Sequence, residues 1–285
     1  MKKLSGKILI LFTCMAAALF LFSCGDKPAA EETPDTPAYT ITASDGKEGT
    51  ITISEDGKTI TLQPEETDVE YTITGEFEGQ IINKTKGTVI VLNNANLKNT
   101  EGKAVIYGEL KTEIKYEKDT TNTITVTGTA DKTYGKAAFL CGKAIEIGGE
   151  GTGTISCEKG HGVKGSKVEL KGSGNYVFGP AKDSAINCND FEVKADKTFT
   201  ATLKDAKNGI KADNTISIVS GTFKFENITK VALKTDTSAD DQEGETKEHK
   251  ITLKGGDFSF ANCGKIYETE ENGFTKSATV TGDFN

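Results

Sequence analysis

One short phrase recurs five times between Gly135 and Phe260, and this repeat constrains the fold more than any other feature of the sequence. Each copy starts at an apolar-led dipeptide, and the step from one dipeptide to the next is nearly constant. Two apolar-x-apolar triplets follow each dipeptide. Short alternating strands at a fixed period in the low twenties are typical of a β-solenoid. The five dipeptides are Leu140-Cys141, Val163-Lys164, Ile186-Asn187, Ile210-Lys211 and Leu233-Lys234.

Composition agrees with an all-β chain and excludes one class of ligand. The 285 residues include 31 Gly and only 5 Pro, and helical periodicity is absent after residue 25. The formal net charge is −8, and no arginine occurs. Because phosphate neutralisation and base readout both depend on Arg and Lys, an acidic chain without Arg is a poor nucleic-acid binder. We expect no nucleic-acid partner.

The N-terminus reads as an export signal. Lys2, Lys3 and Lys7 precede an apolar run from Ile8 to Phe22, which is the layout of a secretory signal peptide over residues 1–23. The sequence Leu21-Phe22-Ser23-Cys24 resembles the bacterial lipobox, which implies cleavage before Cys24 and acylation of its thiol, with palmitate as one such acyl group. The mature protein would then be held on the outer membrane or the cell surface. An uncleaved transmembrane anchor is the alternative, although the run is short for one.

The rest of the chain is predicted to form one domain on a tether. Residues 24–38 contain Pro28, Pro34 and Pro37 among small and acidic residues, which is typical of a flexible linker. Residues 39–285 form the domain, and alternating strands over 39–75 are expected to cap its first end. Residues 235–249 interrupt the period with acidic side chains and are expected to form an inserted loop.

Several phrases of the repeat resemble a known family. They are an apolar strand ending in Leu92, the Asn-rich turn 93–97, Gly102-Lys-Ala-Val-Ile and the Asn-Thr-Ile-Thr strand near Val126. A later turn, Asn208-Gly-Ile-Lys-Ala-Asp213, completes the pattern. Together they resemble the bacterial carbohydrate-binding domain family with a pectate-lyase-like fold. The resemblance implies carbohydrate binding and a right-handed parallel β-helix of about 23 residues per coil with irregular N-terminal capping strands.

Stacking of equivalent positions turns each repeat position into a column of side chains about 4.8 Å apart. Two columns that mix aromatic and aliphatic residues, including Tyr176, Phe178, Phe223 and Phe225, are predicted to point into the core, because they alternate with polar residues. The absence of Trp also argues against sugar-stacking platforms. A column of glutamates that begins at Glu146 needs compensation from neighbouring lysines or from a cation.

A second column points outward and is the predicted ligand-binding row. It contains Lys164, Asn187, Lys211 and Lys234, each one residue after an inward apolar position. We call these four residues the lysine column. Evenly spaced ammonium groups suit the carboxylates of a uronic-acid polymer. The alternative is a solvated face that discourages aggregation of the sheet.

Turn residues supply the candidate metal ligands. The resemblance implies calcium at such turns, and Ca²⁺ takes six to eight oxygen ligands from side chains and carbonyls. Lys182 and Lys207 stand where the family tends to have a further acid, which counts against a cation there. The candidate ligands are Asp183, Asn189, Asp190, Asn208 and Asp213.

We therefore expect a non-catalytic, lipid-anchored carbohydrate-binding protein of the cell envelope. Its partner would be an extended, acidic or neutral polysaccharide: a pectin-like or cellulose-like polymer, or a host glycan. A structural or adhesive surface lipoprotein that binds protein is the alternative, and a polysaccharide lyase is a lesser one, because no Arg is present to serve as the base and the acids are dispersed. The cysteines form no CxxC pair, so buried thiols are expected rather than a metal cluster.

Overall fold

A computed structural model describes residues 38–44, 46, 50–64, 69–128, 136–236 and 247–281 of the protein. These residues form 21 strands of one sheet. Within the described ranges, no helix is both long and apolar enough to cross a bilayer. The strands are β1 (Tyr39–Ala43), β2 (Ile51–Ile53), β3 (Thr59–Leu62), β4 (Glu70–Glu78), β5 (Gln80–Asn83), β6 (Thr88–Asn99), β7 (Ile106–Gly108), β8 (Thr112–Tyr116), β9 (Thr121–Val126), β10 (Ala137–Cys141), β11 (Ala144–Gly149), β12 (Thr152–Cys157), β13 (His161–Leu170), β14 (Asn175–Val193), β15 (Thr200–Ile218), β16 (Thr222–Thr235), β17 (Lys250–Leu253), β18 (Asp257–Ala261), β19 (Lys265–Glu268), β20 (Phe274–Lys276) and β21 (Thr279–Thr281).

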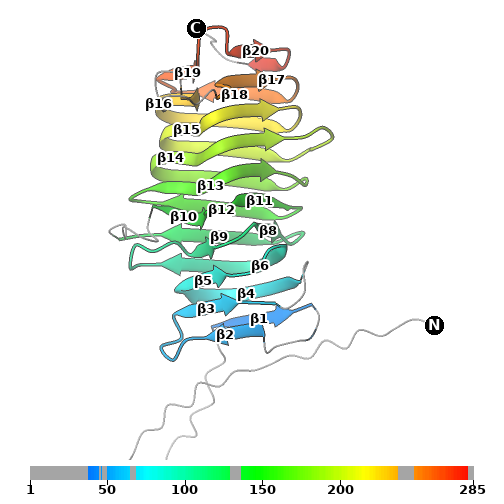
Figure 1. The fold of residues 1–285 in the computed structure, drawn as a ribbon, viewed down its shortest axis with the longest axis vertical. Helices are drawn as coiled ribbons and strands as arrows, with labels where there is room; N and C mark the ends of the chain where they lie inside the picture. The colour runs from blue at the N-terminus through cyan, green and yellow to red at the C-terminus, as the bar shows by residue number, and fades with distance from the viewer. Residues whose placement is uncertain are drawn as a thin grey trace, which may run out of the picture.

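The chain winds around a single apolar core, and most strands pair in parallel with a strand that follows later in the sequence. Strands β13, β14, β15 and β16 pair in this order, each with the next. We call the chain between a residue and its parallel partner one circuit. Figure 1 shows the strands lying across the long axis of the molecule, from β1 and β2 at one end to β20 at the other.

The aromatic columns point inward, as the alternation predicts. Tyr176, Phe178, Phe223 and Phe225 are at most 1% exposed. Phe223 stacks on Phe258 one circuit later, with ring centroids 5.4 Å apart. Burial of such rings is the main favourable contribution to folding in each circuit, because the stabilisation is roughly proportional to the apolar area removed from water.

The glutamate column is neutralised by lysines, which confirms the simpler of the two expectations. Glu146 pairs in register with Glu169, and Glu169 with Glu192. Lys171 Nζ lies 2.7 Å from Glu146, and Lys194 Nζ lies 3.0 Å from Glu169. The like charges of neighbouring strands are therefore interleaved with opposite ones.

The predicted fold needs correction. A right-handed parallel β-helix that forms an open solenoid of about 23 residues per coil with irregular N-terminal capping strands is wrong, because the described residues form one 21-stranded sheet closed around a single core. The circuits are uneven along a single column, in which Ile60 pairs with Ile81, Ile81 with Ile106, and Ile106 with Phe139. Each of these steps is longer than the one before it. Insertions of different length between strands explain this spread. The all-β class is confirmed.

The first end of the sheet is more regular than expected for a cap over residues 39–75. Strands β3 and β4 already pair in parallel with β5 and β6. Only β1 and β2 depart from this pattern, because they run antiparallel to β4 and β3. This antiparallel pairing covers backbone groups that would otherwise form an open sheet edge. The signal peptide, the tether up to residue 37, Cys24 and residues 237–246 of the acidic loop lie outside the described residues.

The cysteines of the described ranges are free thiols. Cys141, Cys157 and Cys188 are buried, and Cys263 is partly buried. Burial is the largest cause of the raised pKa of all four thiols. They behave as small core residues rather than as nucleophiles, because the reactive species is the thiolate.

Candidate functional site

The residues of the lysine column lie side by side on one outward face. Lys164 pairs with Asn187, Asn187 with Lys211, and Lys211 with Lys234. The column continues to Leu140 before Lys164 and to Glu268 after Lys234. Residues one period apart in the sequence therefore lie next to each other on neighbouring strands.

A polar hollow lies over part of this column, on strands β13, β14 and β15. Its volume is about 380 Å³, near the lower end of the roughly 300–1,000 Å³ usual for small-molecule sites. Three members of the lysine column and four of the five candidate calcium ligands line it. We call it the β13–β15 hollow. Its lining residues are His161, Lys164, Gly165, Asp183, Ser184, Asn187, Asn189, Lys207, Asn208, Lys211 and Asp213.

Buried polar side chains line part of the hollow. Ser184 is 1% exposed and Asn208 is 8% exposed. The Asn208 amide Nδ2 donates to the Ser184 hydroxyl at 3.3 Å. The pairing of β14 with β15 is irregular between Ala181 and Ser184. Such bulges re-aim side chains and often lie beside binding sites, and this one accompanies polar groups at positions that elsewhere hold apolar residues.

His161 is fixed as a neutral hydrogen-bond donor at the edge of the hollow. Its Nδ1 accepts the backbone N–H of Ser184 at 3.2 Å. Burial first, and then the nearby charge of Lys164, lower the pKa of His161 to about 4. With Nδ1 used as an acceptor, the neutral ring carries its proton on Nε2. His161 therefore offers an N–H to a ligand and is not poised as a base.

The lysines of the column differ in how much of their charge is already compensated. Lys211 Nζ lies 3.2 Å from Asp236 and 3.7 Å from Asp213. Lys234 is paired with Glu268 of β19. Lys164 has no carboxylate partner within the described ranges. The predicted row of free ammonium groups is therefore reduced to Lys164, and the exposed Lys207 of β15 is a second free cation in this part of the structure.

Asp213 is the most perturbed carboxyl of the hollow. Burial raises its pKa, and the neighbouring Asp236 acts in the same direction, whereas Lys211 and Lys164 oppose the shift. The two carboxyls lie on adjacent circuits with the Lys211 ammonium close to both. This arrangement holds Lys211 in place more than it offers Asp213 to a ligand.

The calcium candidates do not fit a calcium site. The Asp190 carboxylate accepts hydrogen bonds from Thr215 at 2.8 Å and from Asn214 at 3.4 Å, and Asp190 does not line the hollow. Lys211 places an ammonium beside Asp213, where a cation would have to bind. Within the described ranges, no three His, Cys, Asp or Glu side chains are grouped as metal ligands.

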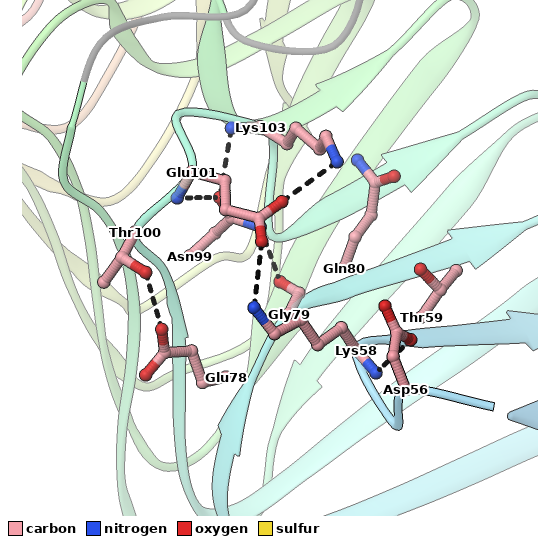
Figure 2. A pocket seen from close by; sticks show the side chains of 10 residues that line it. All are labelled: Asp56, Lys58, Thr59, Glu78, Gly79, Gln80, Asn99, Thr100, Glu101 and Lys103. Atoms are coloured by element: carbon pink, nitrogen blue, oxygen red, sulfur yellow. Dashed lines mark hydrogen bonds and ion pairs between the residues drawn. The ribbon is translucent and has the colours of Figure 1, made fainter. Parts of the chain in front are cut away.

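A second polar pocket, of about 50 Å³, lies between the turns that join β2 to β3 and β6 to β7. Figure 2 shows its charged groups bonded to one another: Lys58 and Lys103 each donate to the Glu101 carboxylate at 3.0 Å. The Asn99 side chain accepts the backbone N–H groups of Glu101 and Lys103. These internal bonds satisfy the groups that a ligand would need. We interpret this pocket as a stabilising network of turns.

Sequence reasoning missed several residues of the β13–β15 hollow. His161 is one of two histidines in the chain and lies outside the predicted ligand-binding row. The repeat contained the signal, since His161 and Ser184 lie one period apart and are hydrogen bonded. Tyr107 was also missed, and Leu140, which the predicted repeat aligns with Val163, instead pairs with Lys164. They precede Lys164 in the lysine column and are only partly buried, so they add an apolar surface beside the hollow.

The fold and the hollow define an all-β protein with a polar hollow on its outward face. Comparison with known families agrees with this class. Residues 47–279, most of the chain, match the family of carbohydrate-binding domain-containing proteins. The chain belongs to that family.

One solved structure gives the same fold. It is described as a polysaccharide lyase-like protein from C. thermocellum, in a gadolinium derivative. The TM-score is 0.60 at 16% identity, over 81% of this chain and 90% of that chain. At this identity the likeness shows the fold alone. No curated protein matches the sequence.

Proposed function

We propose that this protein is a non-catalytic polysaccharide-binding protein of the bacterial cell envelope, and that it binds the sugar chain in the β13–β15 hollow. Membership of the carbohydrate-binding family supports the ligand class. The observation that carries the site is the pair of buried polar side chains, Ser184 and Asn208, that line this hollow. Sugar hydroxyls need both donors and acceptors, and Asn and Ser side chains supply both.

The proposal includes the location of the protein. The basic and apolar N-terminus and the sequence ending in Cys24 support export and a lipid anchor in the outer membrane or at the cell surface. Incorporation of labelled palmitate into the chain, and its loss in Cys24→Ala, tests this part. Unchanged labelling of Cys24→Ala would contradict it.

The chemistry of the hollow favours binding over lyase activity. Abstraction of a proton beside a carboxylate needs a base near its working pKa. His161 presents an N–H and uses its other nitrogen for Ser184, and Asp213 is paired with Lys211. We expect no rise in ultraviolet absorbance from unsaturated products when the protein is incubated with pectin and Ca²⁺. A sustained rise would make the protein an enzyme.

Affinity gels test the proposed binding. Native gels containing pectin, hydroxyethyl cellulose or a host glycosaminoglycan should retard the protein in at least one case. Asn187→Ala and Asn189→Ala, which remove side chains of the hollow, should weaken this retardation. Ser217→Ala is the matched control, because Ser217 lies on the neighbouring strand β15, in the glutamate column and outside the lining of the hollow. Absence of retardation on every glycan would favour the adhesive role, in which the partner is a protein.

A further inference from the structure

The uncompensated charge of the β13–β15 hollow is positive. Its cations are Lys164, Lys207 and Lys211, and its acids are Asp183 and Asp213. The charge of Lys211 is shared between Asp213 and Asp236. Asp236 does not line the hollow, so the lining residues carry three cations and two acids. Lys211 lies between two carboxylates, and a ligand that enters the hollow meets its positive charge at Lys164 and Lys207, in a chain whose overall charge is −8.

Donors of the hollow lie on β13 and β14. Asn187 is the residue opposite Lys164 on the next strand. His161 lies three residues before Lys164 on strand β13, and the charge of Lys164 is the largest cause, after burial, of the low pKa of His161. Lys164, His161 and Asn187 therefore supply an ammonium, a neutral Nε2–H and a side-chain amide to the lining of one hollow. Carboxylates only accept hydrogen bonds, and bonds to charged groups are about twice as strong as neutral ones.

The surroundings of the column give the direction of the ligand. On one side of Lys164 the column continues as Leu140 and Tyr107, which are partly exposed. On the other side it ends at Lys234 and Glu268, which neutralise each other. A sugar chain that crosses the strands along this column would rest its apolar ring faces on Leu140 and Tyr107. Its charged group would then lie at Lys164, and not at Lys234.

We propose that the β13–β15 hollow binds the carboxylate of an acidic sugar residue within a polysaccharide, with Lys164 as the principal cationic contact and Lys207, His161 and Asn187 as further donors. This inference rests on the proposed function, because it names the ligand class of the same hollow. The inference differs from the prediction made from the sequence, in which Lys164, Lys211 and Lys234 contribute alike to ligand binding.

The test compares one oligosaccharide with and without its charge. Isothermal titration measures binding of the protein to a galacturonate oligomer and to the fully methyl-esterified oligomer of the same length. The acid form should bind about tenfold more tightly, which corresponds to about 1.4 kcal/mol, because hydrogen bonds to a charged group are stronger than hydrogen bonds to a neutral ester. Lys164→Gln should abolish this preference. Lys164→Arg should restore most of it.

Lys234→Gln is the matched control, because Lys234 occupies the same column but is paired with Glu268. It should retain the preference for the acid form. Equal binding of acid and ester by the unmodified protein would overturn the inference and leave the proposed function standing, as would equal losses in Lys164→Gln and Lys234→Gln. Absence of binding to these oligomers and to every neutral polysaccharide would overturn both. Circular dichroism of each variant establishes that a loss of binding is not a loss of fold.

Discussion

The titration of His161 links the hollow to the stability of the whole domain. Its pKa is lowered to about 4 in the folded protein, first by burial and then by Lys164, whereas an unfolded histidine has a pKa of about 6.5. Between these values the unfolded chain binds the extra proton, so stability falls as pH falls from about 6.5 to about 4. Above pH 6.5 the histidine is neutral in both states and contributes no pH dependence.

The magnitude follows from the two pKa values. The full difference between them corresponds to about 3.4 kcal/mol, at about 1.36 kcal/mol for each pH unit. Between pH 7 and pH 5 only part of this is lost, and we expect about 1–2 kcal/mol. His161→Asn removes the titration and keeps an acceptor, Oδ1, for the Ser184 N–H. Over this interval the variant should therefore lose less stability than the unmodified protein, by about 1–2 kcal/mol.

Urea unfolding at pH 7 and pH 5 measures this difference. Asn187→Ala is the control, because it alters the same hollow without removing a titrating group, and its pH dependence should match that of the unmodified protein. Asp183, Lys211 and Lys136 also act on His161, and they are retained in every variant. If His161→Asn and the unmodified protein lose the same stability between pH 7 and pH 5, the reasoning is refuted.

Four further predictions concern other contacts. Burial raises the pKa of Glu146, but its bonds to Lys111 and Lys171 outweigh burial and lower the pKa to about 2. Glu146→Gln should therefore lower the unfolding free energy by about 1 kcal/mol at pH 7, and this loss should shrink as pH falls from about 4.5 towards 2. The control Glu117→Gln, at an exposed position, should show no such loss. Gly153→Ala would drive a Cβ into the Tyr116 ring and should lower stability by about 2–3 kcal/mol in urea titrations, whereas Gly142→Ala, with no atom within 4 Å, should not. Tyr107→Ala should weaken binding of acid and ester oligomers about equally, by about fivefold in titration calorimetry, because it removes apolar contact and no charge; a loss confined to the acid form would contradict this. EDTA should leave retardation on polysaccharide gels unchanged, because Lys211 occupies the place beside Asp213 that a cation needs. Loss of retardation would show that a metal ion is required.

The repeat predicts much of the sheet because pairing in register converts a period into a column of side chains. The burial of Phe223 and Phe225 and the neutralisation of Glu146 and Glu169 were both predictable from the alternation of apolar and polar residues. The uneven circuits were not. Where the step lengthens between Ile106 and its partner Phe139, the period is lost from the sequence although the pairing continues.

The N-terminal strands show a second limit of pattern reasoning. Thr-Ile alternation in Tyr39–Ala43 and in Glu70–Glu78 predicts strands but not their direction, because parallel and antiparallel partners show the same side-chain alternation. The antiparallel pairing of β1 with β4 depends on the end of the sheet, where an open edge must be covered. The predicted open β-helix was wrong because closure of the sheet around one core is not specified by the side-chain alternation.

The position of the predicted binding row stays a prediction. Lys164, Asn187 and Lys211 of the lysine column line the hollow proposed as the site. Which lysine is free could not be predicted, because the partner of Lys234 is Glu268, a residue of β19 outside the regular repeat. His161 and Ser184 are joined by a backbone N–H that no residue pattern specifies.

Binding in the β13–β15 hollow is tested most directly by amide hydrogen exchange with and without the polysaccharide that retards the protein in gels. Ligand bound in the hollow should slow exchange in residues 161–165 of β13, 183–189 of β14 and 207–213 of β15, the segments that line it. Exchange in the turns near Lys58 and Glu101 should stay the same. Protection confined to those turns, or to the strands of the glutamate column, would contradict binding in the hollow.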